Sequence, residues 1–233
     1  MLTGMNFYQP IIPLIIDGLA QTQSQQIIDL CSGGGGAIEQ IENNLQKQSG
    51  NKIQIILTDK YPNHNAFEFI AVKTKGRISF SDIPVNATDV PASLNGFRTI
   101  FSGFHHFDKQ QAKSVIRNAV DARAGIGIFD GGERNIFIIL AMIVVHPIAF
   151  FLLTPFFKPF RFSRLVFTYL IPIIPICTIW DGIISIIRLY DPSELLNMAR
   201  QVENEKYTWK AGSVKNKLGM NVTFLTGYPL IKT

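Results

Sequence analysis

Apolar runs and helix-like stretches alternate along the first 131 residues of the chain. Short runs rich in Ile, Val and Phe predict buried strands, and apolar positions at helical spacing predict helices between them. The strands are expected at 27–30, 52–59, 77–85, 97–104 and 125–131, and the helices at 11–20, 37–48 and 108–122. Buried strands that alternate with helices are typical of βαβ units and a parallel sheet.

The C-terminal part of the chain predicts one more helix and a β-hairpin. Residues 191–204 begin with an Asp at the N-cap position, a Pro in the first turn and a Glu at the capping-box position, which together favour a helix. Residues 207–214 and 222–229 alternate between apolar and polar side chains and are separated by a short turn. We expect this hairpin to extend the sheet.

An apolar insert separates these two parts. Residues 136–157 carry no fixed charge, and residues 165–187 carry only Asp181, which we expect to pair with Arg188 or Arg134. Either stretch is long enough to cross a bilayer, which requires about 20 residues. The chain therefore divides into a first part (1–135), a helical membrane hairpin (136–188) and a closing part (189–233).

The topology of the insert has two interpretations. Hydropathy alone favours two spans, but two spans would place the basic turn 158–164 across the membrane from the rest of the chain, against the positive-inside tendency. Prolines also interrupt both stretches, and His146 before Pro147 is expected to mark a helix break. These observations favour a re-entrant or surface-lying hairpin, with the remainder of the chain on the cytoplasmic face.

Composition agrees with an apolar insert in an otherwise ordinary domain. Hydrophobic residues make up 47% of the chain and charged residues only 17%. The net charge of +5 is mild, and no run of Lys and Arg suggests a nucleic-acid partner. Cys31 and Cys177 are far apart and lack metal-site spacing, so we expect neither a disulfide nor a metal site.

A glycine-rich loop, "DLCSGGGGAIEQ" (29–40), follows the first predicted strand. Such a turn lets the backbone approach a ligand closely at the N-terminus of a helix. Asp59 ends the second predicted strand, where a carboxylate can accept hydrogen bonds from both hydroxyls of a ribose. No Lys follows the glycines, which argues against a phosphate loop, and the pattern differs from a dinucleotide fingerprint. The combination predicts a cofactor that carries a nucleoside.

The same residues resemble the class I S-adenosylmethionine-dependent methyltransferases. In that family the first motif is acid-x-Gly-x-Gly-x-Gly, which Asp29, Gly33 and Gly35 match and in which Cys31 replaces the first glycine. Asp59 matches the ribose-binding acid of the family. Residues 85–91 resemble the segment that packs on the adenine, and residues 99–107 resemble the fourth motif at the mouth of the active site. The resemblance covers about residues 20–131 and 190–230.

The resemblance implies an α/β fold, with a Rossmann-like, doubly wound, seven-stranded sheet that carries the apolar insert. It implies S-adenosyl-L-methionine as cofactor, and the following residues are expected to bind it: Asp29, Cys31, Gly33, Gly35, Asp59, Lys60, Asn86, Ala87 and Ser102. His105 and His106 follow the fourth strand, where a histidine can take a proton from a methyl acceptor. The alternative for these histidines is a structural hydrogen bond or a place in the pocket wall.

Together these features predict a membrane-associated methyltransferase whose acceptor is lipid-soluble or otherwise apolar. The insert follows the fifth strand, so it leaves the sheet at the edge where the cofactor is expected. The alternative is a non-catalytic membrane protein that uses a methyltransferase-like fold as a ligand-binding or scaffolding module. A channel or transporter is disfavoured, because two Pro-broken segments rarely form a pathway without oligomerising.

Overall fold

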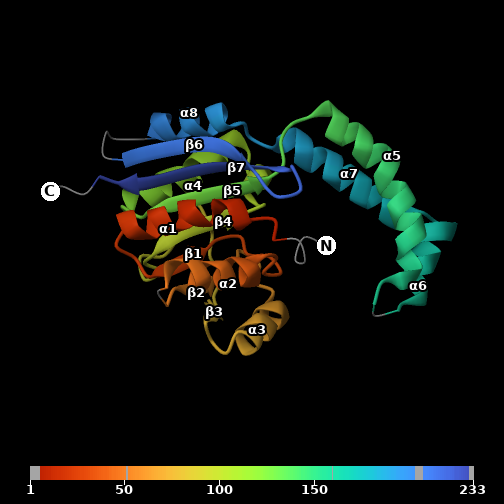
Figure 1. The fold of residues 1–233 in the computed structure, drawn as a ribbon, viewed down its shortest axis with the longest axis horizontal. Coiled ribbons are helices and arrows are strands. Elements are labelled where there is room, and N and C mark those ends of the chain that lie inside the picture. The colour runs from red at the N-terminus through yellow and green to blue at the C-terminus, as the bar shows by residue number, and fades with distance from the viewer. Residues whose placement is uncertain (1–5, 51, 159, 203–206, 231–233) are drawn as a thin grey trace. The chain divides into compact units, whose positions relative to one another are not determined.

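The fold was analysed in a computed structural model that describes residues 6–50, 52–158, 160–202 and 207–230. Its centre is a seven-stranded sheet of order β3-β2-β1-β4-β5-β7-β6 (Figure 1). Five parallel strands come first: β1 (Gln26–Asp29), β2 (Gln54–Leu57), β3 (Ile78–Phe80), β4 (Phe97–Phe101) and β5 (Ile126–Gly131). The strand order reverses between β1 and β4, which confirms the doubly wound topology.

A β-hairpin completes the sheet. β7 (Asn221–Pro229) lies antiparallel to β5, in a register that pairs Gly131 with Val222. β6 (Tyr207–Lys215) pairs with β7 along its whole length and forms the edge of the sheet. The alternating pattern at the C-terminus therefore predicted this hairpin correctly.

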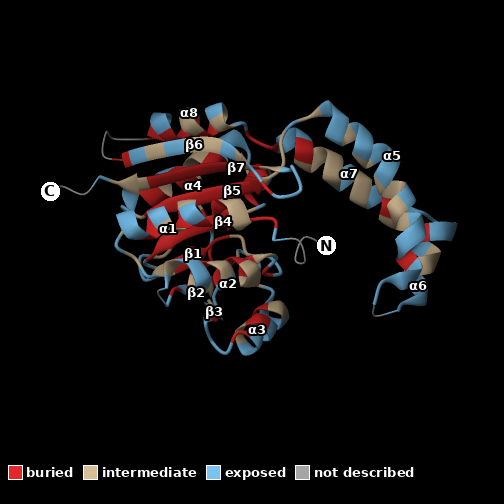
Figure 2. Cartoon of the chain, in the orientation of Figure 1, coloured by how far each residue is buried: buried red, intermediate tan, exposed pale blue. Residues whose placement is uncertain are grey.

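Helices cover both faces of the sheet. α1 (Ile12–Gln21), α2 (Ile38–Ser49) and α3 (His64–Lys73) bury apolar side chains in one cluster with β1, β2 and β3. α4 (Lys109–Asp121) and α8 (Pro192–Val202) bury theirs in a second cluster on the other face. Figure 2 shows the central strands as mostly buried, which explains why their sequences lack a polar face, whereas the edge strand β6 is mostly intermediate or exposed.

Local sequence accounts for how these helices begin. Asp108 accepts hydrogen bonds from the N–H groups of Gln110 and Gln111 and forms a complete capping box, as predicted for α4. α3 was not predicted, although the Asn63 side chain accepts a hydrogen bond from the N–H of Ala66 and caps it. The third strand is also shorter than the predicted 77–85, because the chain after Phe80 turns toward the carboxyl end of β2.

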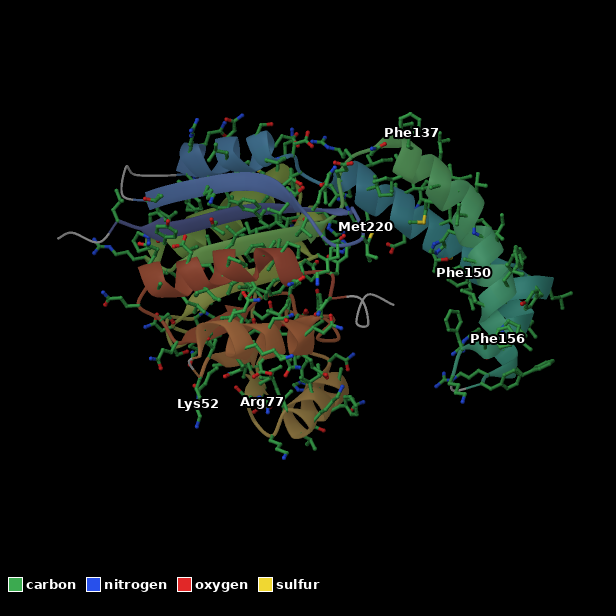
Figure 3. All side chains as sticks on the ribbon, in the orientation of Figure 1. Lys52, Arg77, Phe137, Phe150, Phe156 and Met220 are labelled. Atoms are coloured by element: carbon green, nitrogen blue, oxygen red, sulfur yellow. The ribbon has the colours of Figure 1, made fainter. Side chains whose placement is uncertain are left out.

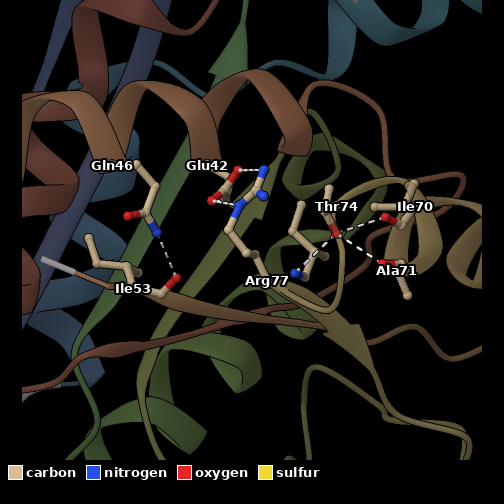
Figure 4. Close-up of polar contacts among 8 residues, drawn as sticks. Glu42, Gln46, Ile53, Ile70, Ala71, Thr74 and Arg77 are labelled. Carbon is tan, nitrogen blue, oxygen red and sulfur yellow. Dashed lines mark hydrogen bonds and ion pairs between the residues drawn. The ribbon is translucent and has the colours of Figure 1, made fainter.

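An ion pair joins α2 to the turn before β3. The Arg77 guanidinium donates two hydrogen bonds to the Glu42 carboxylate, at 2.8 and 3.2 Å, and Glu42 is almost completely buried (Figure 4). In the same turn the Thr74 hydroxyl donates to the Ile70 carbonyl at 2.8 Å. These bonds tie α2 and the end of α3 to the turn before β3.

The insert forms a compact unit of its own, residues 133–189, separate from the unit formed by residues 1–132 and 190–233. It begins with α5 (Ile136–Leu153) and the short η4 (Thr154–Phe156). α6 (Phe162–Leu165), the π-helical η5 (Val166–Leu170) and α7 (Ile173–Arg188) follow. Among the described residues, Ile136–Phe156 is long and apolar enough to cross a membrane. The pair Phe162–Leu170 and Ile173–Arg188, bent by 74°, passes the same test as one broken segment.

Two expectations for the insert were wrong. Pro147 lies inside α5, so His146 does not mark a helix break; one missing backbone hydrogen bond did not end this long apolar helix. Asp181 is exposed and forms no ion pair among the described residues, so the expected pairing with Arg188 is absent. The exposed surface of the insert is strongly apolar, with Phe137 75% and Phe156 78% exposed (Figure 3).

Candidate functional site

The site is built at the carboxyl ends of the parallel strands, beginning with Asp29 at the end of β1. Its side chain is only 4% exposed. One carboxylate oxygen accepts from the Thr99 hydroxyl of β4 at 2.9 Å, and the other accepts from the Ser32 hydroxyl at 2.7 Å. Asp29 and Thr99 are opposite each other in the β1–β4 register, so the sheet itself brings these two groups together.

Burial dominates the electrostatics of Asp29. Desolvation raises its pKa to about 7, although the hydrogen bonds from Ser32 and Thr99 oppose this rise, and the Asp59 carboxylate adds to it. The carboxyl therefore titrates near neutral pH in the folded chain. A cation bound nearby would favour its ionised form and lower this pKa.

The glycine loop after Asp29 has left-handed backbone at several positions. The φ angles are 58° at Cys31, 55° at Gly33, 79° at Gly35 and 32° at Gly36. Cys31 therefore has a backbone conformation that residues with a side chain rarely adopt. Its Cβ lies 3.4 Å from the position that a Cβ on Gly103 would occupy, so the loops after β1 and β4 are in contact. Burial raises the pKa of the Cys31 thiol to about 12.

Two glycines of the motif have different surroundings. A Cβ at Gly33 would meet no atom within 4 Å, so this backbone is open to a ligand. A Cβ at Gly35 would lie 2.1 Å from Cδ1 of Ile70 in α3, so the Ile70 side chain would have to move, and the φ of 79° itself disfavours any side chain at this position. The open position is therefore Gly33, and Gly35 supports the loop from behind.

Asp59, after β2, reaches the glycine loop directly. One of its carboxylate oxygens accepts from the Gly33 N–H at 2.8 Å, and the other accepts from the Tyr61 N–H at 2.8 Å. The side chain is half-buried, so each oxygen keeps a lone pair for a further donor. Lys60 is exposed, and its ammonium lies 5.6 Å from the centre of the Tyr61 ring.

The segment expected to contact an adenine lies beside Asp59. The N–H of Val85 donates to the Asp59 carbonyl at 2.8 Å, which fixes the segment against the end of β2. Val85 and Ala87 are buried, whereas Asn86 is exposed and accepts from the Thr88 N–H at 3.1 Å. The segment thus packs its apolar side chains into the core and leaves the Asn86 side chain exposed after the end of β2.

The end of β4 carries Ser102, which has a left-handed backbone, with φ 49°. Its hydroxyl is hydrogen-bonded to the phenol of Tyr8, from the segment before α1. Tyr8 is buried and its ring packs edge-on against Phe101 at 5.3 Å. Burial raises the pKa of the Tyr8 phenol well above its ordinary value, so the phenol stays protonated.

The two histidines differ in their environment. His105 is buried, and its backbone N–H donates to the Asp130 carboxylate at 3.0 Å. The same carboxylate oxygen lies 3.5 Å from Nδ1 of the His105 ring. The His106 ring is exposed and lies 4.3 Å from the His105 ring, centre to centre. The other oxygen of Asp130 is buried and has no hydrogen-bond partner.

Among the predicted residues, Gly33 and Asp59 join the loops after β1 and β2 directly, whereas Ser102 and His105, after β4, are bonded to Tyr8 and Asp130. Sequence reasoning missed four side chains of this network: Tyr8, Ser32, Thr99 and Asp130. Asp130 had a usable signal, because it ends an apolar strand as Asp29 and Asp59 do. Thr99 had none, since its role depends on the strand register.

Two further observations bound the chemistry of the site. A cavity of about 860 Å³ lies between the glycine loop and α3; it is lined by Gly34, Gly36 and Phe69 but by none of the carboxylates of the site. Among the described residues no group of three or more His, Cys, Asp or Glu could hold a metal ion.

Comparisons with known proteins relate this fold to solved structures. No family model and no curated protein matches the sequence. The methyltransferase domain of bacterial CtHen1-C matches with a TM-score of 0.56 at 12% identity, over 97% of this chain and 100% of that one. The S-adenosylmethionine-dependent methyltransferase SibL matches with a TM-score of 0.56 at 8% identity, over 96% of this chain and 56% of that one.

A third match has its cofactor bound. The O-methyltransferase NcsB1 from neocarzinostatin biosynthesis, solved with S-adenosylmethionine and 2-hydroxy-5-methyl naphthoic acid, matches with a TM-score of 0.51 at 10% identity. The match covers 94% of this chain and 57% of that one. At these identities the likeness concerns the fold alone. The chain thus has the class I fold of S-adenosylmethionine-dependent methyltransferases.

Proposed function

We propose that this chain is a membrane-associated methyltransferase that uses S-adenosyl-L-methionine and methylates an apolar small molecule or a lipid. The observation that carries the proposal is the Asp59 carboxylate bonded to the Gly33 N–H at 2.8 Å. It unites a ribose-binding acid and an open glycine backbone in a fold shared with known methyltransferases. The cofactor would supply an activated methyl group on a sulfonium; the chain supplies binding, orientation and proton transfer.

The residues present fit this cofactor. Asp59 retains acceptor capacity for the ribose hydroxyls, and the bond from the Val85 N–H to its carbonyl holds the 85–91 segment beside it. Gly33 leaves room for close approach of a ligand to the backbone. Asp29 places negative charge behind the loop, which favours a cationic ligand. Methyl transfer then depends mainly on holding two reactants in line.

His105 is the better placed of the two candidate bases. Nδ1 of its ring lies 3.5 Å from an Asp130 oxygen and has no hydrogen-bond partner among the described residues. A small movement of the ring on acceptor binding would close this contact, place the proton on Nδ1 and leave Nε2 as the acceptor. A neutral Nε2 would take the proton that an acceptor hydroxyl loses as its oxygen is methylated. His106 is exposed and its ring lies beside that of His105, so we assign it to the rim.

The apolar insert supports both the membrane location and the acceptor class. Within α5 no side chain is buried, and large side chains such as Phe137 and Leu152 are mostly exposed. Removing apolar surface from water is favourable by about 25 cal/mol for each Å², and a bilayer around the insert would remove much of this surface from water. We place the sheet on the cytoplasmic face, where S-adenosylmethionine is made, and expect an acceptor that partitions into lipid.

One observation favours a second candidate. Both oxygens of Asp59 already accept backbone N–H groups from Gly33 and Tyr61, so the carboxylate has a structural role without any ligand. If Asp59 has only this structural role, the chain would be a non-catalytic membrane protein that uses the fold as a scaffold. Ligand binding separates the two candidates.

Calorimetry on the full chain in detergent tests the proposal. We expect S-adenosylmethionine to bind, and Asp59→Ala to weaken binding about 10- to 100-fold, through loss of hydrogen bonds to a charged group. Asp82→Ala is the matched control, because Asp82 is exposed and lies outside the site. No heat of binding by the unaltered chain, or equal affinity in Asp59→Ala, would establish the scaffold instead.

A further inference from the structure

The turn between β6 and β7, residues 215–220, has an unusual surface, which we call the hairpin tip. Leu218 is 51% exposed and Met220 38% exposed, and both are flanked by the exposed Lys215 and Lys217. From 207 to 229 the sequence contains three lysines and no Asp or Glu. Figure 3 shows Met220 at this turn. The tip thus combines exposed apolar side chains with two exposed lysines.

The backbone of the tip is held in one conformation. The buried Asn216 accepts hydrogen bonds on its side-chain oxygen from the N–H groups of Leu218, at 2.9 Å, and Met220, at 3.0 Å. Its own N–H donates to the Met220 carbonyl at 2.8 Å, and Gly219 supplies the left-handed residue with φ 76°. Leu218 and Met220 are therefore displayed on an ordered turn, which lowers the entropy cost of binding through them.

The tip lies on the side of the sheet where the parallel strands have their carboxyl ends, which is also the side of the candidate site. β7 runs antiparallel to β5, and the Gly132 N–H donates to the Asn221 carbonyl at 2.8 Å, beside the carboxyl end of β5. The carboxyl ends of β1 and β4, with Asp29 and Ser102, belong to the same edge. Gly132 is also the last residue before the insert, so the chain enters the insert beside the tip.

We propose that the hairpin tip docks on the surface of an anionic lipid bilayer. Leu218 and Met220 enter the interface, and Lys215 and Lys217 lie against headgroup phosphates. Charge complementarity selects an anionic over a neutral bilayer, and the apolar pair selects a bilayer over a nucleic acid, whose phosphates would leave these side chains in water. The inference rests on the proposed membrane location and adds to it: docking turns the cofactor edge of the sheet toward the lipid.

Lysine acetylation measured by mass spectrometry tests the docking. The full chain is placed in nanodiscs of phosphatidylcholine alone and of phosphatidylcholine with phosphatidylglycerol. In the anionic discs we expect Lys215 and Lys217 to be acetylated more slowly than in the neutral discs. Each lysine that contacts the anionic surface should slow the acetylation rate about fivefold. Lys47 and Lys52 are exposed at the opposite edge of the sheet and should react equally in both discs.

Variants identify the side chains responsible. Leu218→Ser with Met220→Ser should abolish the protection of Lys215 and Lys217, and Lys217→Gln should reduce that of Lys215 about fivefold. The matched control, Lys47→Gln with Lys52→Gln, makes a charge change of the same kind at the opposite edge and should retain full protection. All these side chains are exposed, so we expect unchanged circular dichroism spectra.

The outcomes separate the inference from the proposed function. Incorporation into discs with equal acetylation in both lipids would overturn docking and leave the membrane location intact. A chain that enters neither disc would overturn both. Protection by double-stranded DNA in solution, without protection in anionic discs, would assign the tip to nucleic acid and refute the lipid proposal.

Discussion

Asp29 predicts how the stability of the chain depends on pH. Its pKa is about 7 in the folded chain, against an ordinary value of 3.8, chiefly because burial disfavours the charged form. Because folding raises this pKa, the contribution of Asp29 to the free energy of unfolding is fully present below pH 3.8, the pKa of the unfolded chain. It is lost as the pH rises to about 7, the pKa of the folded chain. The difference between 3.8 and about 7 corresponds to about 4 kcal/mol.

Asp29→Asn removes the titrating group but keeps an oxygen that can accept from Thr99 and an amide that can donate to Ser32. We therefore expect this variant to be more stable than the unaltered chain by about 4 kcal/mol near pH 8. Near pH 5 the advantage should fall to about 2 kcal/mol, because Asp29 is then mostly protonated in the fold. Urea unfolding of the full chain in detergent, followed by circular dichroism at both pH values, measures these differences.

Asp82→Asn controls for the loss of one carboxylate on the surface. Asp82 is exposed, so this variant should have the same free energy of unfolding as the unaltered chain at both pH values. Two results would refute the reasoning about Asp29. One is an Asp29→Asn variant that is less stable than the unaltered chain at both pH values. The other is a gain in the free energy of unfolding that does not increase from pH 5 to pH 8.

Two further substitutions test the packing around the site. Gly35→Ala should cost about 3 kcal/mol, because its Cβ would overlap Ile70 in a left-handed backbone, whereas Gly33→Ala should cost about 1 kcal/mol. Urea unfolding compares the two, and equal costs would contradict the supporting role of Gly35. Arg77→Gln leaves the buried Glu42 carboxylate without its partner. The melting temperature of Arg77→Gln should therefore be lower than that of Glu42→Gln, and the reverse order would show that the ion pair is not needed.

Much of the fold could be predicted because its strands are buried on both faces. Runs such as 27–30 and 125–131 are continuous and apolar, and acids mark where the strands end. α3 was missed because its sequence mixes exposed apolar side chains, such as Phe69 and Val72, with buried ones, which obscures the helical period. Its only clear sequence signal was the Asn63 cap.

The site could be predicted at single positions but not as a network. Asp29, Gly33 and Asp59 follow from a local motif and its spacing. Thr99 lies 70 residues from its partner Asp29, and Tyr8 lies 94 residues from its partner Ser102, so only the strand register and tertiary packing bring these pairs together. For the same reason sequence alone did not distinguish Gly33, which is open, from Gly35, which packs on Ile70.

The place of the insert has a consequence for synthesis. β5 leaves the ribosome before the insert, but its neighbour β7 is made only after the insert and α8. During that interval β5 is an unpaired, apolar sheet edge, which is the kind of edge that other chains pair with. Entry of the insert into a membrane would hold each nascent chain at the bilayer while this edge is open. The sheet would then close last, on a chain that is already anchored.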